Sequence, residues 1–206
     1  SGGGLSSDAQ YNTVGGTNAG DSFTGTDATN NTLIGYNAGT AITTGDGHVC
    51  LGSSAGESLT TGVNNIIIGS ETGKNITSAS SSIVIGQQAG YTLTTGSMNN
   101  FIGRQTGYYC TTGQRNTGVG HISLLRITTG GGNTAIGQGS GSDITTGDHN
   151  TCLGRNSGSD ITTGDNNICI GYYAQPSSAT VSNEVTIGNS NITKFRVPAL
   201  NFVVKS

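Results

Sequence analysis

The sequence predicts an all-β fold: a parallel β-solenoid (β-roll) of about ten 17-residue coils, intertwined or packed as a homotrimer. Three observations predict it. Glycine recurs in register at one unbroken spacing, a short apolar run precedes each register glycine, and residues that disfavour helices fill the segments between. The register glycines are Gly35, Gly52, Gly69, Gly86, Gly103, Gly120, Gly137, Gly154, Gly171 and Gly188.

The repeat divides the chain into three expected regions. Residues 1–30 are predicted to be a linker and an irregular N-terminal capping coil, because the run Asn12 to Gly15 resembles a repeat start but lies out of register. Residues 31–188 form the predicted repeat shaft. Residues 189–206, which include the most apolar stretch, are predicted to leave the solenoid as an exit or capping segment that wraps or plugs the end of the trimer.

Composition supports a repeat fold and excludes several partners. Hydrophobic residues are 32% of the 206, too few for a conventional layered core, while charged residues are only 9%, fewer than disordered chains usually carry. Eight Lys and Arg are outnumbered by eleven Asp and Glu, so we expect no nucleic-acid partner. No apolar run of about 18 residues is present, so we expect no membrane insertion.

Each repeat contains two short strand-like runs, and so short a repeat cannot form an independent sheet with a buried face. Coils must therefore stack on their neighbours at about 4.8 Å. The column immediately before the register glycine is apolar without exception, so we place it inside the coil: Ile34, Leu51, Ile68, Ile85, Ile102, Val119, Ile136, Leu153, Ile170 and Ile187. A second interior column is expected on the run that follows the glycine: Ile42, Leu59, Ile76, Leu93, Cys110, Ile127, Ile144 and Ile161.

The column two residues before the glycine is then expected to face outward, although it too is mostly apolar. A strand that is apolar on both faces needs cover on both, which a lone thin solenoid cannot provide. We therefore predict a trimer interface at Leu33, Cys50, Ile67, Val84, Phe101, Cys152 and Cys169. A dimer and a free-standing solenoid are the alternatives. The cysteines form no CxxC pair and are interpreted as small apolar filler.

Asparagine recurs four residues before the register glycine, with His48, Ser82 and Glu184 as interruptions. The members are Asn31, Asn65, Asn99, Asn116, Asn133, Asn150 and Asn167. Stacked side-chain amides can hydrogen-bond from coil to coil and satisfy backbone groups at a corner. The column is therefore predicted to be a structural ladder rather than a ligand site.

No catalytic constellation is found in the sequence, and we expect no enzyme. His48, His121 and His149 lie on separate coils, and no Gly-x-Ser-x-Gly motif joins a strand to a helix. A polysaccharide-degrading site between protomers remains an alternative. Four acidic residues are stacked in pairs one coil apart, and they are interpreted either as solvated corners or as a shared structural Ca²⁺ site: Asp143 over Asp160 and Asp148 over Asp165.

Two further columns suggest surfaces. Thr recurs at 43, 60, 77, 94, 111, 128, 145 and 162 beside a second Thr and Ser column, but only one of two adjacent columns can face outward, which disfavours ice binding. Tyrosines follow glycines at corners, where rings can stack on sugar faces or pack between protomers: Tyr36, Tyr91, Tyr108, Tyr109, Tyr172 and Tyr173. These are the candidate receptor or glycan-binding residues.

The unit Asn-Thr-x-Ile-Gly-x-x-Ala-Gly resembles the head repeats of YadA-like trimeric autotransporter adhesins. The segment from Asn183 to Pro198 is similar to segments of viral and phage tail-fibre proteins. These resemblances imply a homotrimeric structural fibre on the virion surface, which mediates host attachment through a cell-surface glycan or protein receptor. A bacterial surface adhesin head of the same architecture is the alternative. Neither resemblance brings a catalytic residue.

Overall fold

The computed structural model describes residues 5–23 and 27–196, and this part of the chain is all-β with no helix. Twelve short strands form one sheet in sequence order. They are β1 (Ser6–Ser7), β2 (Thr13–Gly15), β3 (Thr32–Ile34), β4 (Val49–Leu51), β5 (Ile66–Ile68), β6 (Ile83–Ile85), β7 (Asn100–Ile102), β8 (Thr117–Val119), β9 (Thr134–Ile136), β10 (Thr151–Leu153), β11 (Ile168–Ile170) and β12 (Val185–Ile187).

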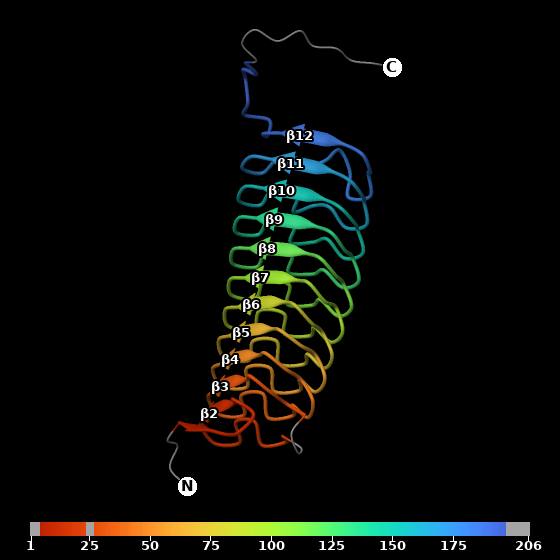
Figure 1. Cartoon of the computed structure of the whole chain (residues 1–206). Helices are drawn as coiled ribbons and strands as arrows, with labels where there is room; N and C mark the ends of the chain where they lie inside the picture. The colour runs from red at the N-terminus through yellow and green to blue at the C-terminus, as the bar shows by residue number, and fades with distance from the viewer. Residues whose placement is uncertain (1–4, 24–26, 197–206) are drawn as a thin grey trace.

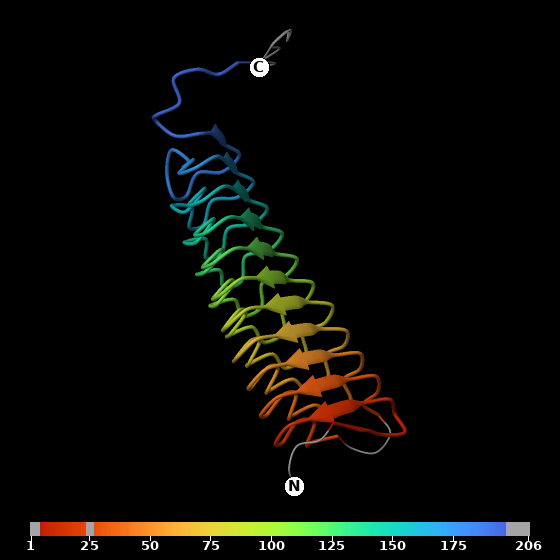
Figure 2. The same cartoon turned by 90° about the vertical axis from the view of Figure 1, so that its left-hand side faces the viewer.

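The strands stack as the rungs of a parallel solenoid, which confirms the predicted β-solenoid of the single chain (Figures 1 and 2). From β3 to β12 each strand residue pairs with the residue one repeat later, as Leu33 does with Cys50. The N-terminal coil is longer by two positions, since Thr13 pairs with Thr32. β1 alone pairs antiparallel, with β2. All strands lie along one side of the rod, and the connecting segments form the rest of each coil (Figure 1).

Each coil has one strand, whereas the sequence suggested two. The Ile-Thr-Thr-Gly run does stack, but two successive amides share one carbonyl of the next coil. The Thr60 and Thr61 N–H groups both donate to Thr77 O, at 2.9 and 3.3 Å, and the Thr60 hydroxyl donates to the same oxygen at 3.0 Å. A carbonyl used three times leaves no alternating ladder, so this run is a corner and not a strand.

The core corrects the predicted sidedness of the strand. The column two residues before the register glycine, expected outside, is buried within the single chain. Leu33, Cys50, Ile67, Val84, Phe101, Cys152 and Cys169 are all 0% exposed. The column immediately before the glycine, expected inside, faces out, as Ile34 and Ile136 show at 39% and 44% exposure. The second interior column, from Ile42 to Ile161, is buried as predicted.

The buried side of the strand is the side that carries the asparagines. Alternation puts the residues four and two positions before the glycine on the same face, so the asparagine column and the Leu33 column enter the coil together. Alternation by itself assigns relative faces only, and both candidate columns were apolar. The asparagines decide which apolar column is buried. Their amides must lie inside the coil, so the Leu33 column on the same face of the strand lies inside with them.

Packing inside the coil depends on matched sizes in neighbouring coils. A Cβ on Gly118 would lie 3.4 Å from Phe101 Cδ1, an ordinary contact, but only 2.6 Å from the Thr106 methyl carbon, so the Thr106 side chain requires a glycine in the next coil. The missing volume at Gly118 is filled from the other side by Leu124, which is fully buried and adopts a positive φ of 50°. Leu124 replaces the glycine that occupies this turn position in most other coils.

The register glycines are required by close stacking. Gly35 has φ 138°, and a Cβ built on it would lie 2.4 Å from Gly52 O in the next coil. The same close approach recurs at the glycine of the following coil. A side chain here would both strain the backbone and separate the coils, which explains the unbroken glycine period.

The predicted asparagine ladder is confirmed by its hydrogen bonds. Asn133 N and Nδ2 donate to Asn116 Oδ1 at 3.0 and 3.1 Å, while Nδ2 also donates to Gly147 O at 2.8 Å. Asn133 Oδ1 in turn accepts from Asn150 N at 2.9 Å. The side chains are fully buried. Each amide therefore joins its own coil to both neighbours.

His48 replaces an asparagine in this ladder and reproduces its bonds. Nε2 lies 2.8 Å from Gly62 O, a pure acceptor, so Nε2 carries the hydrogen. Nδ1 is then free to accept the Asn65 backbone N–H at 3.2 Å. The imidazole is thus neutral. Burial lowers the pKa of His48, although Gly62 O and the nearby Asp46 oppose that shift.

At the C-terminal end residues 189–196 leave the stack, with Asn191–Arg196 exposed (Figures 1 and 2). The remainder of the predicted exit segment, 197–206, lies outside the described residues, as do residues 1–4 of the predicted linker.

We expect Asn133→Ala to lower the free energy of unfolding by about 3 kcal/mol, because it leaves the Asn150 amide and Gly147 O buried without a partner. Urea unfolding followed by circular dichroism measures the change. Thr112→Ala, at an exposed corner, is the control and should change stability by less than about 0.5 kcal/mol. Equal effects in the two variants would contradict the structural role of the ladder.

We expect the rod to lose stability as the pH falls through the unfolded-state pKa of His48. The folded pKa is lowered, so the unfolded chain binds more protons; the contribution is complete above about pH 6.5 and declines below it. His48→Asn, which restores the repeat residue, should flatten the dependence of the melting temperature on pH between neutrality and mild acid. An unchanged slope in that variant would show that other groups cause the pH dependence.

Candidate functional site: the outer face of the sheet

The outer face of the sheet is an uncharged, mostly aliphatic surface that runs the length of the rod. It consists of the first and third residue of each strand from β3 to β12. The third residues are all aliphatic, as the sequence showed, and the first residues are Thr32, Val49, Ile66, Ile83, Asn100, Thr117, Thr134, Thr151, Ile168 and Val185. We call these the third-residue column and the first-residue column.

Neither column contains a charged residue. Ile66, Ile102 and Ile168 are 37–38% exposed, and Ile187 at the C-terminal end is 53% exposed. Polar side chains flank the face, among them Arg104 and Arg155 one residue after the register glycines. A flat apolar centre with a polar rim is the usual anatomy of a protein interface.

The residues predicted for a trimer interface therefore cannot form one. Leu33, Cys50, Ile67, Val84, Phe101, Cys152 and Cys169 pack inside their own coil and are not accessible to another chain. The physical reason for expecting a partner, a strand apolar on both faces, still applies. It applies to the two outer columns, one of which the sequence predicts to lie in the core.

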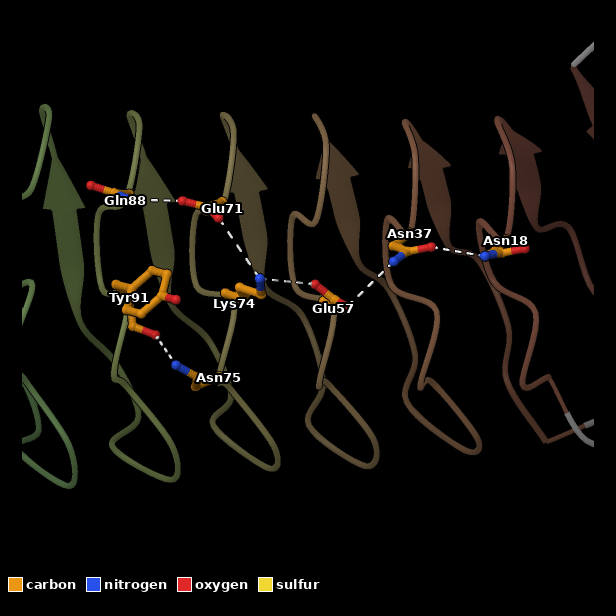
Figure 3. Close-up of polar contacts among 8 residues, drawn as sticks. All are labelled: Asn18, Asn37, Glu57, Glu71, Lys74, Asn75, Gln88 and Tyr91. Carbon is orange, nitrogen blue, oxygen red and sulfur yellow. Dashed lines mark hydrogen bonds and ion pairs between the residues drawn. The ribbon is translucent and has the colours of Figure 1, made fainter.

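Another side of the rod is polar and already internally paired. Figure 3 shows a line of side chains that crosses successive coils, in which Asn18 Nδ2 donates to Asn37, Asn37 to Glu57, and Gln88 to Glu71. Lys74 Nζ lies 3.5 Å from Glu57 and 3.7 Å from Glu71. This side has its charges satisfied along the rod, in contrast to the uncharged sheet face.

The candidate tyrosines fall into two clusters and one isolated residue. Tyr91 and Tyr108, one coil apart, stack with ring centroids 5.0 Å apart and planes within 4°, and Tyr109 meets Tyr108 edge-on at 4.8 Å. The second cluster is Tyr172 with Tyr173, at 5.0 Å. Tyr36 has no aromatic neighbour among the described residues, and it is 56% exposed.

Each tyrosine cluster borders a hollow. The hollow beside Tyr109 and Arg126 has a volume of about 600 Å³. The hollow at the C-terminal end, beside Tyr172, Tyr173 and Asn191, has a volume of about 720 Å³. Arg155 lies over the Tyr172 ring at 5.7 Å. An exposed ring beside amide and guanidinium donors can bind a sugar, whose faces are apolar and whose edges carry hydroxyls.

The stacked carboxylates have partners within the chain. Asp165 Oδ1 accepts the Asp148 N–H at 2.8 Å, and Asp148 Oδ1 accepts the Gly131 N–H at 2.7 Å. Asp143 pairs with Arg126 at 3.3 Å. Asp160 Oδ1 accepts the Ser159 hydroxyl. Among residues 5–23 and 27–196 no group of three or more His, Cys, Asp or Glu is placed to hold a metal ion, so the calcium interpretation gains no support from the geometry.

The threonine column is occupied by bonds within the rod. The hydroxyls of Thr60, Thr94 and Thr128 each donate to the threonine carbonyl of the next coil, at 3.0 to 3.1 Å. These three hydroxyls are therefore used in stacking. The neighbouring column is the exposed one of the two, as the sequence argument requires that only one faces outward: Thr44, Thr61, Ser78, Thr95, Thr112, Thr129, Thr146 and Thr163.

The four cysteines are free and buried. Burial raises the pKa of both Cys50 and Cys110 to about 12. Such thiols are weak nucleophiles at neutral pH. Their environment fits the predicted role of apolar filler.

Comparisons of this chain with models of protein families, with curated proteins and with solved structures found no match. Within the described residues no helix is long and apolar enough to cross a lipid bilayer.

Proposed function

We propose that this chain is the shaft segment of a homotrimeric attachment fibre, exposed on a virion, that positions recognition elements toward a host surface. The observation that carries the proposal is the uncharged aliphatic face along the sheet. At about 4.8 Å per coil, ten coils make this face about 48 Å long, and a width of about 10 Å gives roughly 500 Å². A patch of this area is at the upper part of the range for the largest apolar patch of a soluble monomer, and such patches are often functional.

The shape of the molecule supports a mechanical role. Every coil pairs only with its neighbours in the sheet, and equivalent backbone hydrogen bonds recur from coil to coil. A rod built in this way can hold its two ends at a fixed separation. Identical copies around a common axis cover one another's apolar faces and stiffen the rod further. A shaft of this kind needs no catalytic group, and in the described chain His48 is buried while His121 and His149 remain on separate coils.

Attachment itself is proposed to involve the tyrosine clusters. They lie on the segments between strands and leave the sheet face free for assembly. Their rings border hollows with polar side chains, which is the chemistry that oligosaccharide binding requires.

We expect the purified chain to have the mass of three copies in light scattering after size-exclusion chromatography. Ile102→Glu places a charge on the aliphatic face and should convert it to the monomer. Thr112→Glu places the same charge at an exposed corner of the rod and should leave the trimer intact. A monomeric wild-type chain would refute the assembly, and a dimer would correct its stoichiometry.

We expect a panel of cell-surface oligosaccharides to include one that the assembled rod binds. Tyr109→Ala or Tyr172→Ala should reduce that binding about tenfold or more, because each removes an exposed ring from a hollow. Tyr36→Ala is the control, since that ring borders neither of these hollows. Binding that all three variants retain would separate the tyrosines from recognition.

A further inference from the structure

The first-residue column of the sheet face differs from the third-residue column in one respect. Its centre is polar: Asn100, Thr117, Thr134 and Thr151 follow each other on successive coils, whereas the third-residue column is aliphatic throughout. The side-chain amide of Asn100 makes no hydrogen bond to any residue that the structure describes. An amide on a face that becomes buried costs free energy unless the partner supplies a donor and an acceptor.

We propose that copies of this chain assemble in parallel about an axis beside the first-residue column, so that equal-numbered residues meet and Asn100 fixes their axial register. The inference rests on the proposed assembly and specifies its geometry. Amide and hydroxyl groups are both donors and acceptors, so Asn100 and the three threonines can pair with their own copies. A single buried asparagine fixes register in this way in coiled coils.

The other arrangements leave polar groups unpaired. In an antiparallel assembly in which all ten coils from β3 to β12 overlap, the order of coils reverses, so Thr134 faces Ile83 and Thr151 faces Ile66. In a parallel assembly with the two columns opposed, Asn100 faces Ile102. A slip by one coil places Asn100 against Ile83 on one side. Among these arrangements, only the parallel, in-register one about the first-residue column pairs Asn100 with Asn100 and each of the three threonines with its own copy.

Cysteine cross-linking at the two ends of the column tests the orientation. Thr32 and Val185 begin β3 and β12, at opposite ends of the sheet face. With copper phenanthroline as oxidant, Thr32→Cys should cross-link to its own copy, and so should Val185→Cys, each pair of thiols losing two electrons and two protons. Mixing the two variants should give no mixed product. The native thiols are buried, so the wild-type chain should not cross-link.

An antiparallel assembly would give the opposite result, with cross-links only in the mixture, and would overturn the proposal. An oligomer in which Thr32→Cys stays uncrosslinked while Ile34→Cys cross-links would place the axis beside the other column and also overturn it. These outcomes differ from a monomeric wild-type mass, which would remove the proposed assembly itself.

Asn100→Ile tests the register. In the Thr32→Cys background this change should raise the melting temperature of the assembly yet lower the cross-linking yield several-fold, because slipped alignments are no longer penalised. Asn100→Thr keeps a self-complementary hydroxyl and should preserve the yield. If Asn100→Ile leaves the yield unchanged, the amide does not fix the register and that part of the proposal fails.

Discussion

The rod depends on the hydrogen bond that one buried asparagine makes to the next. Such short strands supply too few sheet bonds to hold a whole coil, and the glycine carbonyl that ends a Thr-Thr-Gly corner, such as Gly147 O, is buried in the coil, away from water. The amide satisfies that corner and binds the neighbouring coil with the same group. Where the residue changes, the bonds persist: Ser82 N donates to Asn65 Oδ1 at 3.0 Å, and the Ser82 hydroxyl accepts the Asn99 N–H at 3.2 Å.

Because the ladder occupies the interior, it also determines which side of the strand is left outside. The amides turn one face of the strand inward, and the aliphatic residues of the other face have no cover in their own chain. The same constraint that stabilises the coil therefore generates the surface on which assembly is proposed. The polar side of the rod, where Lys74 lies between two glutamates, has no comparable need for a partner.

The features that follow directly from the 17-residue period were predicted from the sequence: the solenoid, the asparagine ladder and the buried column that begins at Ile42. It misassigned the strand faces because alternation gives only relative sides, and both the Leu33 and Ile34 columns are apolar. Two signals in the sequence pointed to the correct side. The asparagines are an even number of positions from the Leu33 column and so share its face, and in that column Phe101 is followed one coil later by Gly118, as expected where side-chain volumes must compensate in a confined interior. Tyr91 and Tyr108 stack because they occupy the same position in successive coils. The contact of Tyr109 with Tyr108, by contrast, could not be predicted without the shape of the coil. Leu124 occupies a position where most other coils have glycine, and nothing in the sequence indicated that its side chain is buried.

Size matching across coils has a consequence for how such a rod can change length. Adding or removing one whole repeat keeps every stacking bond, so most of the shaft is a chain of exchangeable modules. The segment from Phe101 to Leu124 is different, because the Phe101 ring and the Thr106 methyl group of one coil pack against Gly118 and Leu124 of the next coil. A duplication or deletion with an end inside that segment would leave a hole or a clash. Repeats can thus be gained or lost on either side of the segment from Phe101 to Leu124 without disturbing the core, but not within that segment.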